Sequence, residues 1–272
     1  MTIALNLTRR GILQGSAAAI AATQFMPKVA TAAATDIPRI SGLPWVSGGT
    51  DYTTPTLESF RARPLDVRVT FGSRNTWQQI RTAYGFSGQM GLSKTGRIVA
   101  TYVPFPVEQN PKTGGVEIWK AAARGDYDAH HEAAAISFAN FGRPLIFRIG
   151  HEWNARYAHW NCCDKEFAGY YKDYFRRVAD ILRRRNPGAL IDWNSVKGGE
   201  ATAGLQTFYP GSDYVDFIGC DKYDFWPAST TQAIWDKDLN TLRLGGPNGV
   251  GSFLAYAKSE GKPLSFAEWG VI

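Results

Sequence analysis

The stretch Pro144-Leu145-Ile146-Phe147-Arg148-Ile149-Gly150-His151-Glu152-Trp153-Asn154 decides how this chain folds. It begins as an apolar run typical of a strand buried on both faces, and it ends abruptly in polar and aromatic residues. In parallel α/β proteins, ligands bind outside the carboxyl ends of the strands, so a glutamate after such a run is placed for chemistry. A second stretch has the same design: Pro263-Leu264-Ser265-Phe266-Ala267-Glu268-Trp269-Gly270. The sequence therefore predicts two strand-end glutamates, Glu152 and Glu268, at one site.

A rhythm of strand, loop and helix repeats from Pro38 onward. The expected strands are Pro44–Gly48, Leu65–Phe71, Arg97–Phe105, Pro144–Gly150, Ala189–Ser195, Tyr214–Asp221 and Pro263–Ala267. The clearest helices are Lys165–Arg185, which has one apolar stripe and Asp164 as its N-cap, and about Val250–Ser259.

This alternation predicts a single domain over residues 35–272, an α/β protein with a (β/α)₈ TIM-barrel fold. The sequence stops at Ile272, so the barrel is expected to be truncated after strand 7. A doubly wound open sheet would alternate in the same way. It usually carries a glycine-rich phosphate turn after its first strand, and Ser47-Gly48-Gly49-Thr50 is only a weak match to one.

Residues 1–34 have the pattern of a twin-arginine signal peptide. Arg9 and Arg10 precede a weakly apolar, alanine-rich run, and small residues follow at Ala30-Thr31-Ala32-Ala33-Ala34. A membrane anchor is the rival interpretation, but polar residues interrupt the apolar run, which is too short to span a bilayer. We therefore expect a protein secreted or delivered to the periplasm by twin-arginine export, with no membrane association once the signal is removed.

Charge and cysteine content exclude several classes of function. Without residues 1–34, 27 basic residues face 24 acidic ones, a net charge of +3, and no basic stripe is interleaved with aromatic residues, so no nucleic-acid partner is expected. The three cysteines form no disulfide framework, although Cys162 or Cys163 could pair with Cys220 after export. No zinc or calcium spacing occurs, so neither a metal nor another cofactor is expected, and a monomer is predicted.

Paired carboxyl groups and a high aromatic content point to sugar chemistry. Glycosidic bond cleavage needs one protonated and one ionised carboxyl group. Aromatic residues make up 13% of the chain, which suits stacking on sugar rings but is also compatible with a large aromatic core. Glu152 could instead form a salt bridge with Arg148 or Arg156, and Glu268 could cap a backbone amide at the barrel rim.

The sequence resembles glycoside hydrolase family 26, a family made up mainly of endo-β-mannanases within a clan of retaining barrel enzymes. The resemblance covers about residues 40–272 and is strongest from residue 144. It lies in Arg148-Ile149-Gly150-His151-Glu152-Trp153-Asn154 with Trp160, in Tyr209-Pro210-Gly211-Ser212-Asp213-Tyr214-Val215-Asp216-Phe217-Ile218-Gly219 with Asp221 and Tyr223, and in residues 261–270.

The resemblance implies that Glu152 is the general acid/base and Glu268 the nucleophile. It places His151 beside the acid, with Tyr223 hydrogen-bonded to the nucleophile and Arg148 orienting the carboxylates. The further substrate-binding candidates are Trp153, Asn154, Trp160, Trp226 and Trp269, of which Trp153, Trp160 and Trp226 are candidates for sugar stacking. Weaker candidates are Trp193 and Asn194, and we expect His130, His131 and His159 to be surface residues.

These features together predict an exported retaining β-glycoside hydrolase that cleaves a β-linked polysaccharide by double displacement, with β-1,4-mannan first. The alternatives are a β-glucanase or xylanase of the same family, and a polysaccharide-binding barrel with impaired catalysis. The carboxyl groups of a retaining enzyme are about 5–5.5 Å apart.

Overall fold

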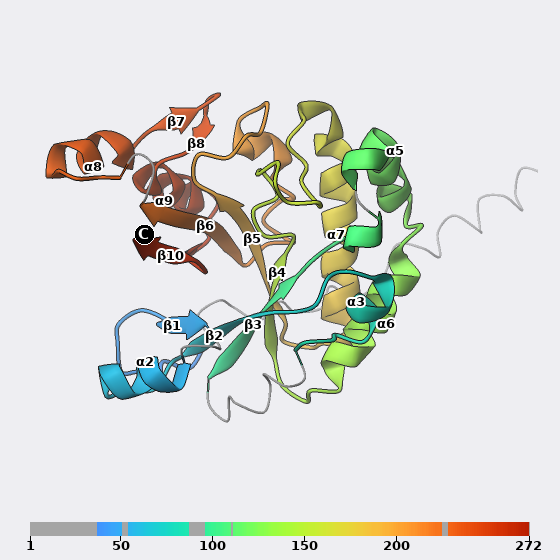
Figure 1. The fold of residues 1–272 in the computed structure, drawn as a ribbon, viewed down its shortest axis with the longest axis horizontal. Helices are drawn as coiled ribbons and strands as arrows, with labels where there is room; N and C mark the ends of the chain where they lie inside the picture. Colours follow the sequence, from blue (N-terminus) through green and yellow to red (C-terminus); the bar gives the residue numbers. More distant parts are fainter. Residues whose placement is uncertain (1–36, 51–53, 87–95, 110, 225–227, 272) are drawn as a thin grey trace, which may run out of the picture. The chain divides into compact units, whose positions relative to one another are not determined.

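One curled sheet of parallel strands forms the centre of the protein (Figure 1). The computed structural model describes residues 37–50, 54–86, 96–109, 111–224 and 228–271. The strands run in the order β1-β2-β3-β4-β5-β6-β10, and β9 also pairs with β6. Their bounds are β1 Gly48–Thr50, β2 Val67–Phe71, β3 Arg97–Tyr102, β4 Leu145–Ile149, β5 Leu190–Val196, β6 Phe217–Asp224, β9 Leu264–Ser265 and β10 Trp269–Val271.

The predicted barrel class is confirmed, since seven strand positions in parallel follow one another in chain order. The seventh position is interrupted. Leu264 in β9 pairs with Ile218 near the start of β6, whereas Trp269 in β10 pairs with Lys222 nearer its end. Glu268 therefore lies in the gap between two short pieces of one strand.

The first strand begins later than the sequence pattern predicts. Asp66 accepts hydrogen bonds from the backbone N–H groups of Ser41 and Ser47, so this carboxylate holds the segment before Gly48 as a loop. The residues of the expected leader, 1–34, lie outside the described part of the chain. Within the described part, no helix is long and apolar enough to cross a membrane.

Helices pack along the outer face of the sheet, and α3, α5, α6 and α7 gather on one side of it (Figure 1). The helices are α2 Thr54–Arg61, α3 Trp77–Arg81, α5 Pro111–Arg124, α6 Asp128–Ala139, α7 Ala168–Arg185, α8 Gln232–Leu239 and α9 Val250–Ser259. Short 3₁₀ turns cover Val107–Gln109, Lys165–Phe167 and Leu205–Phe208, and a small antiparallel pair joins β7 Leu242–Arg243 to β8 Gly246–Pro247.

Helix α7 confirms the amphipathic pattern of the sequence, because Tyr171, Val178 and Leu182 are all buried on one face. The predicted N-cap is wrong. The Asp164 side chain caps no backbone N–H and instead forms an ion pair with Arg156 at 2.6 Å. Helix α9 begins and ends at the predicted residues.

Alternate residues of each strand enter two separate cores. On β4, Leu145 and Phe147 face the helices, while Ile146 joins a smaller cluster inside the curve of the sheet. Leu190 on β5 and Phe217 on β6 belong to the same inner cluster. Polar residues follow on the same face: Arg148 on β4, Asp192 and Asn194 on β5, and Asp221 on β6.

The three cysteines, Cys162, Cys163 and Cys220, are free and buried. The disulfide that the sequence allows is not formed in this structure.

The prediction that His131 is a surface residue is wrong. Its side chain is fully buried on α6, between the hydroxyls of Tyr102 and Tyr174, with each O···N distance 2.6 Å. The Tyr174 hydroxyl donates to the carbonyl of Pro104, so its oxygen is left to accept from Nε2–H, and Nδ1 accepts from Tyr102. His130 and His159 are half-buried.

This histidine predicts a loss of stability in acid. Burial lowers the pKa of His131 from 6.5 to about 3, so the folded protein binds its proton less readily than the unfolded chain. The stabilisation is complete above pH 6.5 and is lost as the pH falls toward 3, by about 5 kcal/mol in all. Urea unfolding at pH 7, 6, 5 and 4 measures this loss. In His131→Gln the free energy of unfolding should depend less steeply on pH, by the slope that one bound proton gives. Equal slopes for the two proteins would contradict the prediction.

Candidate functional site

The end of β4 turns sharply, and the turn places Glu152 over the inner face of the sheet. Gly150 and Glu152 both have positive φ, 57° and 52°. This conformation is uncommon and strained for a residue other than glycine, and such residues gather at functional sites. Glu152 is only 8% exposed, so this strained backbone belongs to a buried glutamate.

Glu268 is held in the gap of the seventh strand by β6. Its carbonyl accepts from the backbone N–H of Lys222 at 3.0 Å, and its own N–H donates to Oδ1 of Asp221 at 3.1 Å. Its carboxylate accepts two further bonds, from Arg148 Nη1 at 2.8 Å and from the Tyr223 hydroxyl at 2.9 Å. Both oxygens thus face donors, one of them a cation, which is the environment of an ionised carboxylate.

Arg148 is the fully buried cation at the centre of the site. Its Nη2 donates to Asn194 Oδ1 at 2.9 Å and forms an ion pair with Asp221, while Nη1 binds Glu268. Burial alone would lower the pKa of Arg148, but the carboxylates of Asp221 and Glu268 raise it overall. The guanidinium therefore stays charged and links three strand positions.

Asn194 and Asp221 connect the backbones of the two glutamates. The N–H of Glu152 donates to Asn194 Oδ1 at 3.3 Å, and the N–H of Glu268 donates to Asp221 Oδ1. Asn194 Nδ2 in turn donates to Asp221 Oδ1 at 2.9 Å. Gly219, on β6 beside Asn194, leaves the space for this layer, because a Cβ there would lie 2.7 Å from Asn194 Nδ2. The two glutamates are thus positioned by one shared network.

The carboxyl groups of Glu152, Asp221 and Glu268 lie together. One oxygen of each lies within 4.8 Å of the others, a grouping that could in principle ligate a cation. Arg148 already supplies positive charge to this cluster through its bonds to Asp221 and Glu268. The geometry therefore needs no ion to bring the three carboxyl groups together.

The two glutamates have different electrostatic surroundings. Burial is the main cause of the raised pKa of Glu152, a hydrogen bond from Tyr157 opposes it, and the charge of Glu268 adds to it. Arg148 binds Glu268 rather than Glu152, and Arg156 pairs with Asp164, so the salt bridges considered for Glu152 are not formed. A carboxyl group with a raised pKa, Glu152, thus faces one whose two oxygens accept hydrogen bonds from Arg148 and Tyr223.

His151 is a buried neutral imidazole next to Glu152. Burial, with the positive charge of Arg148 second, lowers its pKa well below the ordinary value. Its Nδ1 is buried and has no hydrogen-bond partner in the described part of the chain. Trp160 donates from Nε1 to the His151 carbonyl at 2.7 Å, and the guanidinium of Arg74 lies 5.1 Å from the centre of the indole.

Two of the predicted sugar-stacking tryptophans are covered by protein. Trp153 is fully buried against Trp193 and Phe208, and we assign it to the core because a stacking platform needs a free face. Trp160 is 3% exposed and lies between His151 and Arg74, where it supports the histidine. Trp193 is likewise a core residue.

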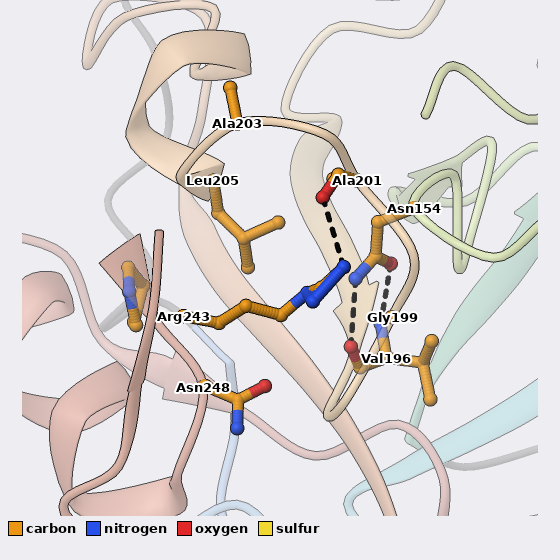
Figure 2. A pocket seen from close by; sticks show the side chains of 9 residues that line it. Asn154, Val196, Gly199, Ala201, Ala203, Leu205, Arg243 and Asn248 are labelled. Atoms are coloured by element: carbon orange, nitrogen blue, oxygen red, sulfur yellow. Dashed lines mark hydrogen bonds between the residues drawn. The ribbon is translucent and has the colours of Figure 1, made fainter. Parts of the chain in front are cut away.

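Asn154 uses its amide to join two loops. Its Nδ2 donates to the carbonyl of Val196 at 2.8 Å, and its Oδ1 accepts from the N–H of Val196 at 2.9 Å (Figure 2). Both bonds border a small pocket that is also lined by Gly199, Ala201 and Arg243, and Arg243 donates to the Ala201 carbonyl. Neither glutamate lines this pocket.

Among the predicted substrate-binding tryptophans in the described residues, Trp269 is the one whose side chain is exposed. It directly follows Glu268, is 51% exposed, and packs edge-on against Trp235 and Phe266. Trp226, the third stacking candidate, lies outside the described residues.

Asp221 and Tyr157 are site residues that the sequence analysis did not assign. Asp221 shares the strand parity of Tyr223, so counting in twos along β6 could have placed it on the inner face. The Tyr157 hydroxyl donates to Glu152 from a loop that no periodicity describes. Asn194, a weaker candidate in the sequence, is a central member of the network.

Comparison with known proteins agrees with this geometry. Residues 132–243 match the sequence model described as glycosyl hydrolase family 26. A mannan endo-1,4-beta-mannosidase of Bifidobacterium adolescentis is 33% identical over 108 residues, which are 36% of this chain and 10% of that protein. One of Bacillus subtilis is 31% identical over 90 residues, 31% of this chain and 24% of that protein. Over residues 132–243 the chain is thus similar to glycoside hydrolase family 26.

Solved structures of the family share the fold. A family 26 beta-mannanase from Bacteroides ovatus superposes with a TM-score of 0.58 at 18% identity, covering 83% of this chain and 72% of that one. An endo-beta-1,4-mannanase from Cellulomonas fimi gives a TM-score of 0.57 at 17% identity, covering 83% of this chain and 56% of that one. The chain spans only 10% to 34% of the length of the curated relatives it matches.

Proposed function

We propose that this chain is a family 26 glycosidase that hydrolyses a β-linked polysaccharide by double displacement, with β-1,4-mannan as its first substrate. The observation that carries the proposal is the Glu152–Glu268 pair, whose carboxylate oxygens approach within 4.8 Å. Retaining glycosidases hold their carboxyl groups about 5–5.5 Å apart, and inverting ones about 6.5–9.5 Å apart to admit a water molecule. The short separation supports direct attack by one carboxylate.

In the proposed mechanism Glu268 attacks the anomeric carbon, because hydrogen bonds from Arg148 and Tyr223 orient its carboxylate. Glu152, with its raised pKa, gives its proton to the leaving oxygen. Glu152 then takes a proton from the water that hydrolyses the glycosyl-enzyme, which returns both groups to their starting states. Mannan is placed first because the matched relatives from Bifidobacterium adolescentis and Bacillus subtilis are named mannan endo-1,4-beta-mannosidases.

The test is incubation of the purified chain with mannan, β-glucan and xylan, followed by measurement of new reducing ends and of the anomer first released. Reducing ends from mannan with the β-anomer formed first support the proposal. Turnover of glucan or xylan alone would change the substrate. Binding of polysaccharide without new reducing ends would favour a carbohydrate-binding barrel instead.

We also propose export through the twin-arginine pathway, which rests on Arg9, Arg10 and the alanine-rich run after them. Cell fractionation tests it with Arg9→Lys/Arg10→Lys. Retention of the variant in the cytoplasm, with the parent chain outside it, is the expected result. The same distribution for both proteins would refute the pathway.

A further inference from the structure

Tyr157 joins the carboxyl group of Glu152 to the outer surface of the site. Its hydroxyl donates to Oε2 of Glu152, although the residue as a whole is 67% exposed. Glu152 itself is 8% exposed, so one end of the tyrosine reaches a buried group while its ring borders solvent. The contact comes from a residue five places further along the same loop.

Each glutamate thus accepts a hydrogen bond from a tyrosine hydroxyl, but the other partners of the two residues differ. Glu268 accepts from a tyrosine hydroxyl and from Arg148, whereas Glu152 accepts from the Tyr157 hydroxyl and has its own N–H bound to Asn194. The backbone bond fixes where the Glu152 main chain lies, but several side-chain torsions separate it from the carboxyl group. The tyrosine hydroxyl is placed to fix those torsions.

We propose that Tyr157 is a positioning residue for the acid/base carboxyl group, which its hydroxyl holds in one orientation and whose ionised form it stabilises. The inference rests on the proposed role of Glu152. A phenol hydroxyl keeps its proton through the reaction, so it can donate to Oε2 in both protonation states and leave Oε1 for proton exchange with the leaving oxygen and with water.

Other groups also act on the protonation of Glu152, and a test must hold them constant. They come from β4, β6, the loop after β2 and the gap between β9 and β10: Arg148, His151, Asp221, Tyr223, Arg74 and Glu268. Tyr157→Phe removes one hydroxyl and leaves all of these charges in place. Because the lost bond favours the ionised carboxylate, the pKa of Glu152 should rise by about half a unit to one unit.

The first measurement does not require turnover. Carbon-13 NMR titration of glutamate carboxyl groups, with Glu152 assigned by Glu152→Gln, gives its midpoint in the parent chain and in Tyr157→Phe. Tyr214→Phe, which changes a tyrosine that precedes β6 and packs against Arg176, is the matched control and should leave the midpoint unchanged. Tyr157→Leu lacks the same hydroxyl, should give the same shift, and serves if the phenylalanine variant fails to fold.

The second measurement uses activity. In Tyr157→Phe the basic limb of the kcat/KM profile should move to higher pH by the same amount, and kcat/KM at the optimum should fall about tenfold. An unchanged Glu152 midpoint in both Tyr157 variants would overturn the inference. If the parent chain shows no turnover, the proposed function fails while the NMR titration still decides the role of Tyr157.

Discussion

Glu268→Ala should lower the turnover of β-linked polysaccharide by about 10⁴-fold or more, because the variant lacks the group that forms the covalent intermediate. The substitution also leaves space beside Arg148 and Tyr223, the two donors that hold the carboxylate in the parent chain. A small anion such as azide can enter this space and attack the anomeric carbon from the same side. Activity should therefore return with azide, and the product should be the inverted glycosyl azide.

The matched control is Glu260→Ala, which removes a half-buried glutamate at the end of α9 whose carboxylate accepts from Ser212. It should keep parental activity and should not respond to azide. Product formation is followed by reducing-end assay and by proton NMR of the anomeric centre. Substantial turnover by Glu268→Ala without an added nucleophile would remove Glu268 from the mechanism.

Arg148→Met should lower the free energy of unfolding by about 3–5 kcal/mol, because it leaves buried carboxylates without their cation. Asp221 has no exposed side-chain surface and Glu268 has 16%, so solvent cannot replace the lost charge. Urea denaturation at pH 7 measures the change. The double variant Arg148→Met/Asp221→Leu should recover part of the loss, since it removes both partners of the buried pair.

Arg156→Met provides the comparison for a solvent-exposed arginine. Its ion pair with Asp164 has side chains that are 46% and 35% exposed, and such pairs contribute about 1 kcal/mol or less. A loss of similar size in Arg148→Met would show that the buried network is not a main source of stability.

The sequence predicted the strand-end placement of both glutamates because that placement follows from local patterns. Apolar runs mark the strands, and the first polar residues after them mark the carboxyl ends. The same logic explains the inner polar layer, in which Arg148, Asn194 and Asp221 continue the parity of Ile146, Leu190 and Phe217. Strand periodicity therefore predicts more residues of the site than the motifs do alone.

Side-chain contacts between distant segments could not be read in this way. Trp153 directly follows Glu152, and its indole ring is of the kind that stacks on sugars. The direction of its side chain, however, is set by a turn in which Gly150 and Glu152 have positive φ. Packing against Trp193 and Phe208 then places it in the core. His131 was misplaced for a similar reason, because its partners Tyr102 and Tyr174 lie 29 and 43 residues away.

The backbones of both glutamates are hydrogen-bonded to side chains of β5 and β6, Glu152 to Asn194 and Glu268 to Asp221. Strands β5 and β6 hold the two backbones, and Arg148, Tyr223 and Tyr157 orient the carboxyl groups, so the stereochemical course of the proposed reaction depends on these residues. A library that keeps β5, β6, Arg148 and Tyr157 intact and varies other loop residues should therefore yield enzymes that still release products of one anomeric form.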